Sequence, residues 1–123
     1  MNIRPTHREL TGKIKQAVKA VSDGWICILD QEILARDALE LGYRVSDLSD
    51  ILIDLLSAIL PEDYIGHQPP EKSYEDKIKG IELFVFKAYS QVLGCNVYLK
   101  FGLKGEFIWI ISLHEFETKG GKP

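Results

Sequence analysis

The sequence is poor in residues that crosslink a chain or bind metals, with two cysteines and three histidines among 123 residues. Cys27 and Cys95 lie far apart inside apolar segments. We therefore expect two buried free thiols in a reducing compartment, with one disulfide as the alternative. No cysteines and histidines have the spacing of zinc ligands, and no glycine-rich phosphate loop precedes a helix. We expect no metal site and no cofactor.

Long hydrophobic runs are also missing. Apolar stretches such as 107–113 are far too short to span a bilayer. The basic residues near the N-terminus are not followed by an apolar leader segment, so we expect no signal peptide. These features predict a cytoplasmic protein without membrane contact. The length fits one domain over 1–123, with a disordered tail from about 117.

The chain lacks an overall basic excess, since its net charge is −3. Residues 1–22 carry five basic and one acidic side chain, and residues 23–63 carry two basic and ten acidic ones. Residues 64–123 are nearly balanced, with eight basic and seven acidic side chains. Proteins that bind nucleic acids usually have a basic face. The negative net charge is mild evidence against RNA binding. The acidic excess is confined to residues 23–63, however, so a locally positive site elsewhere is still compatible with the sequence.

The first half of the chain has helical patterning. Thr6 and Glu9 predict a capping box at the start of the first helix, and Ser46 is expected to cap the third. Apolar side chains recur at helical spacing, which predicts one buried face on the first and third helices. The segment 25–29 is apolar on every side and is either a buried strand or the lead-in to a helix. The predicted helices cover 6–21, 30–41 and 46 to about 59.

The second half is rich in β-forming residues, and a long polar segment at 61–80 precedes it. That segment is either a mobile connector or a loop that lines a substrate site. The order of elements predicts an α+β fold, with N-terminal helices packed on one face of a small antiparallel sheet. The opposite face of the sheet is expected to be open. The predicted strands are 81–87, 94–101 and 107–115, with a turn at 102–106.

Polar side chains on these strands form the candidate site. In the strand 94–101, Tyr98 and Lys100 lie on the face opposite the apolar residues, because strand side chains alternate. His114 lies near the end of the last strand, two residues after Ser112. Lys87 ends the first strand but shares a face with apolar residues, so a bulge or the strand end has to free it.

Taken together, the motifs Glu62-Asp63-Tyr64-Ile65-Gly66, Phe84-Val85-Phe86-Lys87, Val97-Tyr98-Leu99-Lys100 and Ile111-Ser112-Leu113-His114-Glu115 resemble the C-terminal half of MqsR-like bacterial toxins. These toxins belong to the broader RelE-like group of small RNA-cleaving toxins. The resemblance covers about half of the chain, from Pro61 to Glu115. It implies a RelE-like microbial RNase fold, cleavage of messenger RNA without a metal, and inhibition by a cognate antitoxin.

The resemblance also implies roles for single residues. Tyr98 and Lys100 match the family's Tyr-x-Lys, and His114 and Lys87 lie where relatives place basic residues. These four are the expected catalytic residues. Apart from the resemblance, we expect Tyr64, His67 and Glu115 to bind the substrate. The chain departs from the pattern at Leu113, where an aromatic residue is common, and at His67.

Such a site needs a base for the ribose 2′-hydroxyl, a cation for the phosphate and an acid for the leaving oxygen. The sequence does not decide whether Tyr98 or His114 is the base. The alternative function is a non-catalytic interaction module, either a degenerate relative of these toxins or an adaptor, whose acidic helices bind a basic partner. A monomer and a homodimer both stay open.

Overall fold

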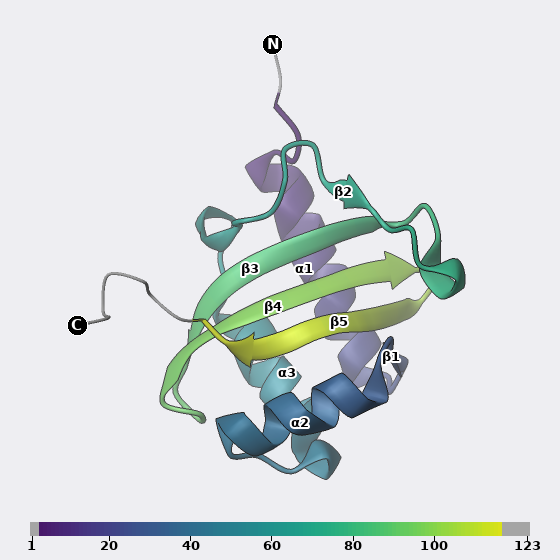
Figure 1. The fold of residues 1–123 in the computed structure, drawn as a ribbon. Coiled ribbons are helices and arrows are strands. Elements are labelled where there is room, and N and C mark those ends of the chain that lie inside the picture. The colour runs from purple at the N-terminus through teal and green to yellow at the C-terminus, as the bar shows by residue number, and fades with distance from the viewer. Residues whose placement is uncertain (1–2, 117–123) are drawn as a thin grey trace, which may run out of the picture.

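Three N-terminal helices pack against a five-stranded open sheet in the computed structural model, which describes residues 3–116 (Figure 1). The predicted α+β fold is therefore confirmed, while the predicted tail from about 117 lies outside the described residues. No helix within residues 3–116 is long and apolar enough to cross a membrane. The helices are α1 (His7–Ser22), α2 (Gln31–Leu41) and α3 (Leu48–Ala58), and the strands are β1 (Ile26–Ile28), β2 (Glu71–Lys72), β3 (Glu82–Ser90), β4 (Cys95–Lys104) and β5 (Phe107–Glu115).

The strands lie in the order β1-β5-β4-β3-β2, and only β1 and β5 run parallel. The apolar segment 25–29 thus contains an edge strand. The turn between β4 and β5 is shorter than predicted, because β4 continues through Gly102 to Lys104. A Cβ atom at position 102 would lie only 2.6 Å from Cδ1 of Ile81, so glycine fits this position better than a residue with a side chain. The turn itself is Gly105-Glu106, with Gly105 at φ +60°.

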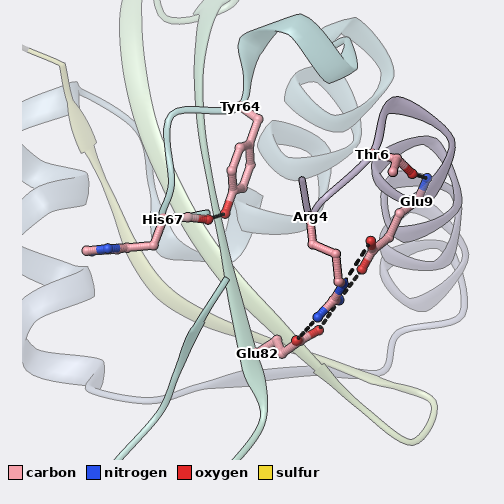
Figure 2. A network of polar contacts seen from close by, with 6 residues as sticks. All are labelled: Arg4, Thr6, Glu9, Tyr64, His67 and Glu82. Carbon is pink, nitrogen blue, oxygen red and sulfur yellow. Dashed lines mark hydrogen bonds and ion pairs between the residues drawn. The ribbon is translucent and has the colours of Figure 1, made fainter. Parts of the chain in front are cut away.

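The start of α1 confirms only half of the predicted capping box. The Thr6 hydroxyl accepts a hydrogen bond from the Glu9 amide at 3.0 Å. The Glu9 carboxylate does not reach back to Thr6 but pairs with Arg4, whose guanidinium also binds Glu82 at the start of β3 (Figure 2). Arg4 therefore ties the chain before α1 to the sheet.

The ends of α2 follow the prediction, but the start of α3 does not. The Asp30 carboxylate accepts from the Ile33 amide at 3.0 Å, and Gly42 ends α2 in the left-handed conformation at φ 88°. Ser46 was predicted to cap the third helix. Instead it lies inside a short 3-10 turn, and α3 begins at Leu48 without a side-chain cap.

The main core lies between the sheet and the helices α1 and α3 (Figure 1). On β3 the core face carries Phe84 and Phe86, and the Phe86 ring stacks on Phe101 of β4 at 5.9 Å. The apolar stripe predicted on the third helix is buried as expected. Its members are Leu48, Ile51, Leu52, Leu55, Leu56 and Ile59.

The other face of the sheet is only partly open, which corrects the prediction. Leu83 and Val85 of β3 are buried but do not belong to the main core cluster, and the same holds for Ile78 of the long polar segment. That segment supplies β2, and the Lys77 carbonyl accepts a hydrogen bond from Lys104 Nζ at 2.8 Å. Residues 71–80 of this segment therefore lie along one end of this face, whereas its start at 61–64 packs against α1 and β3.

The two cysteines are free thiols, as expected. Both are half-buried rather than fully buried, because Cys27 and Cys95 lie on short or terminal parts of their strands. Burial raises the pKa of the Cys95 thiol, and the nearby Glu115 carboxylate raises it further.

Candidate functional site

A row of polar side chains crosses three neighbouring strands. Lys87 of β3 pairs with Tyr98 of β4, and Tyr98 pairs with His114 of β5. Directly paired side chains of an antiparallel sheet stand on the same face, with Cβ atoms about 4.5–5.5 Å apart. The structure therefore brings three of the four expected catalytic residues into one row, on the face opposite Phe84, Phe86 and the other core residues.

The rings of Tyr98 and His114 stack on each other. Their centroids are 4.6 Å apart and their planes differ by 11°. Both side chains are half-buried, so the stack is partly accessible from the surface while each ring restrains the other. This arrangement limits the rotation of the imidazole and keeps the phenol beside it.

An extra residue in β5 places His114 on this face. Lys100 pairs with Ser112, whereas the next residue of β4, Phe101, pairs with Ile110, so Ile111 has no partner of its own. Strict alternation from the buried Ile110 would turn Ser112 and His114 toward the helices. The bulge reverses the alternation and buries Leu113 instead.

Lys87 reaches the row without any bulge in β3. The sequence suggested that Leu83 and Val85 lie on the core face of this strand, so that Lys87 could be exposed only by a bulge or at the strand end. That interpretation is wrong, because the main core takes the alternate residues Phe84 and Phe86. Lys87 thus shares the face of Tyr98, and its ammonium lies 4.9 Å from the centre of the Phe116 ring.

Lys100 lies in the next row of the same face, between Val85 and Ser112. Its side chain is only 21% exposed, and its Nζ is 3.5 Å from Oε1 of Glu71 in β2. The ammonium is therefore close to the candidate site but partly neutralised by a carboxylate of the long segment. The sequence pattern did not indicate this pair, since it depends on where 61–80 folds.

A backbone contact selects the tautomer of the neutral His114 ring. Its Nδ1 lies 2.9 Å from the carbonyl oxygen of Glu115. A carbonyl oxygen can only accept, so this bond requires the proton on Nδ1. In the neutral imidazole Nε2 is then unprotonated and free to take a proton. Glu115 thus orients His114 through its main chain rather than through its carboxylate.

A surface hollow of about 460 Å³ adjoins the stacked rings. Sequence reasoning missed three of its members. Phe116 continues the two-residue alternation of Ser112 and His114, which was a usable signal. Asp37 and Glu40 gave no signal, because nothing in the sequence shows that α2 lies beside β5. The hollow is lined by Asp37, Glu40, Tyr98, His114, Glu115 and Phe116.

Two expected substrate-binding residues lie elsewhere. The Tyr64 ring packs edge-on against Phe86 with centroids 5.6 Å apart, which places it against the main core. Its hydroxyl donates to the carbonyl of His67, and burial is the main cause of its raised pKa. The His67 ring is exposed and points away from Tyr64 (Figure 2). The structure does not bring either side chain to the hollow.

Within residues 3–116, no three or more histidine, cysteine or acidic side chains are arranged to hold a metal ion. Comparisons with known proteins add no assignment, because no family model matches the sequence and no curated protein matches it either. The resemblance to MqsR-like toxins therefore rests on the quoted motifs alone.

Proposed function

We propose that this protein is a metal-independent endoribonuclease that cleaves messenger RNA, and that it is the toxin of a toxin–antitoxin pair. One observation carries the proposal: the row of Lys87, Tyr98 and His114, with Lys100 beside it on the same face. An ammonium, a phenol and an imidazole are the parts that this chemistry needs. The motif resemblance supports the toxin role and the inhibition by an antitoxin.

The geometry suggests how the roles divide. His114 takes the proton of the ribose 2′-hydroxyl on its free Nε2, and the resulting oxyanion attacks the adjacent phosphorus. Tyr98 donates its hydroxyl proton to the leaving 5′-oxygen, so that a cyclic phosphate and a 5′-hydroxyl form. Lys87 and Lys100 offset the negative charge that grows on the phosphorane. The 2′-hydroxyl makes the reaction specific for RNA.

The test uses a single-stranded RNA in the presence of a chelator. The wild-type protein should cleave it, and His114→Ala should lose about a hundred- to ten-thousand-fold in rate, as is typical for an acid–base group. His7→Ala is the matched control, because His7 is exposed in the first turn of α1, far along the chain from the row. Intact RNA with wild type, or equal cleavage by His114→Ala, would refute the proposal.

The toxin role needs a separate test in cells. Induced expression should arrest growth, and His114→Ala expressed to the same level should not. Co-expression of the protein encoded by the adjacent reading frame should restore growth if that frame encodes the antitoxin. Growth arrest by both forms of the protein would show that toxicity does not come from cleavage.

A non-catalytic interaction module is the second candidate function. Two observations favour it: Glu71 partly neutralises Lys100, and the hollow beside His114 carries three acidic residues. Phosphate binding is weakened by such carboxylates, whereas a basic protein surface is attracted by them. A wild-type protein that leaves RNA intact but binds a basic partner would favour this function.

A further inference from the structure

We propose that the hollow beside α2 receives an arginine side chain of a partner protein. The proposal goes beyond the ribonuclease function and does not depend on it, because it concerns the binding of a cation rather than of a phosphate. The walls of the hollow contain the aromatic rings of Tyr98, His114 and Phe116, and its acidic groups come from Asp37, Glu40 and Glu115.

The carboxylates of the hollow are not used by the protein itself. Asp37 and Glu40 lie three residues apart on α2, which places them on one side of the helix. Neither of them forms an ion pair within residues 3–116, and the same is true of the Glu115 side chain. A concave surface with unpaired carboxylates attracts a positively charged group.

The aromatic wall independently indicates a cation. The Lys87 ammonium, 4.9 Å from the centre of the Phe116 ring, already occupies one face of that ring, so an incoming cation has to use the other rings of the hollow. The stacked Tyr98 and His114 rings stand beside Phe116 in the same hollow. Aromatic rings next to carboxylates are the usual surroundings of a desolvated organic cation.

A guanidinium fits these features better than a metal ion or a phosphate. The acidic groups do not converge as metal ligands do among the residues that the structure describes. They also weaken the binding of a phosphate relative to that of a cation. A planar guanidinium can stack on a ring and bind a carboxylate through two parallel hydrogen bonds, which an ammonium cannot do.

The surroundings suggest that the arginine belongs to a protein chain. Ile33 lies four residues before Asp37 and seven before Glu40, so the three share one side of α2. Ile33 is 40% exposed and lies outside the main core cluster. An apolar side chain next to the arginine in the partner can cover it. If the protein is a ribonuclease, such an arginine would also block access to His114.

The first experiment measures binding by NMR without any RNA. Nα-acetylarginine amide is titrated into the full-length protein, with the neutral, equally long Nα-acetylcitrulline amide and the charged Nα-acetyllysine amide as comparison probes. We expect saturable shifts of the His114 and Phe116 amide signals with the arginine compound, and binding at least tenfold weaker with the other two. Equal shifts from citrulline or lysine would overturn the guanidinium assignment.

Variants and a longer probe test the location and the source. Asp37→Asn with Glu40→Gln should weaken arginine binding at least tenfold, whereas Glu32→Gln with Asp50→Asn removes the same charge at exposed sites and should not. The peptide acetyl-Gly-Leu-Arg-Leu-Gly-amide should bind at least fivefold tighter than arginine amide, and Ile33→Ser should abolish that gain.

An unchanged affinity in the Asp37/Glu40 variant would overturn the proposal. So would a protein dimer in light scattering that the same variant dissociates, since the hollow would then bind a second copy of this chain. A peptide that binds no tighter than the amide would contradict a protein source. Because RNA is absent throughout, failure here leaves the ribonuclease proposal standing, and an inactive ribonuclease leaves this proposal standing.

Discussion

The imidazole of His114 lies parallel to the phenol of Tyr98, with ring centroids 4.6 Å apart. The two residues belong to neighbouring strands and are direct partners across the sheet. The contact exists because β5 contains one residue more than β4 at Ile111. A local irregularity of the strand therefore assembles the candidate site.

The first prediction separates the hydroxyl of Tyr98 from its ring. Tyr98→Phe keeps the stack on His114 and removes only the proton donor, so the RNA cleavage rate should fall about a hundredfold or more. Tyr98→Leu also removes the stack, so its cleavage rate should be lower still. Tyr89→Phe is the control, because Tyr89 is exposed on the same strand as Lys87. Full activity of Tyr98→Phe would show that the hydroxyl takes no part.

The second prediction concerns the extra residue in β5. Deletion of Ile111 removes the unpaired residue, so strict alternation from Ile110 then places Leu113 in the core and His114 on the open face without a bulge. We expect the free energy of unfolding to change by no more than about 2 kcal/mol, because the pairing on both sides of the deletion is preserved. Urea denaturation measures it. Ile111→Val preserves the residue count and should cost less than about 1.5 kcal/mol.

Cleavage and most of the stability should therefore be retained both in the deletion variant and in Ile111→Val. A loss of more than about 4 kcal/mol, or a loss of cleavage in the deletion variant alone, would show that the bulge itself is needed to hold His114 beside Tyr98.

The third prediction concerns pH. Hydrogen bonds from Arg4 hold the pKa values of Glu9 and Glu82 below their usual range (Figure 2). A carboxyl whose pKa is lowered in the folded state stabilises the fold above its usual pKa, and this stabilisation is lost as the pH falls through the lowered value. The urea midpoint should therefore decrease between about pH 5 and pH 3.

Arg4→Gln should flatten that decrease, because the two carboxyls then titrate near their usual pKa. Arg8→Gln is the control, since Arg8 is exposed and forms no ion pair within the described part of the chain. The Arg4 side chain is 46% exposed, so added salt should reduce the effect. An identical pH dependence in Arg4→Gln would contradict the prediction.

The fourth prediction concerns a buried hydroxyl. The Tyr43 oxygen has no hydrogen-bond partner among the described residues, and burial, aided by the charge of Asp37, raises its pKa to about 12. Tyr43→Phe removes a polar atom that is unsatisfied in the fold, so stability should stay equal or rise by about 1 kcal/mol. Thermal unfolding measures the change. A clear loss of stability would show that the hydroxyl has a partner, such as a buried water.

Much of the fold was predictable because the chain has strong local signals. The helical spacing of apolar residues after Thr6, the cap at Asp30 and the glycine at 42 defined α1 and α2 closely. Ser46 failed as a cap since the backbone forms a 3-10 turn there, and propensity alone does not distinguish the two. The edge strand β1 stayed ambiguous and the edge strand β2 was not predicted, because two or three residues carry no periodicity.

The candidate site was predictable only in part. Tyr98 and Lys100 alternate with Val97 and Leu99, so their shared face follows from the sequence. The residues of other elements that contact this face could not be predicted from the sequence. Asp37 reaches the hollow because α2 packs beside β5, and Glu71 reaches Lys100 because β2 folds back onto β3. Both contacts join residues that are distant in the chain.

The sequence by itself determined the helices, the order of the long strands and the side of β4 that carries the phenol, because these depend on neighbours a few residues apart. Only the tertiary structure decided that His114 stands on that same side. The physical reason is that either Leu113 or Ser112 has to face the interior. Burial of the apolar Leu113 is more favourable, and the unpaired residue in β5 allows it while Ser112 stays on the open face.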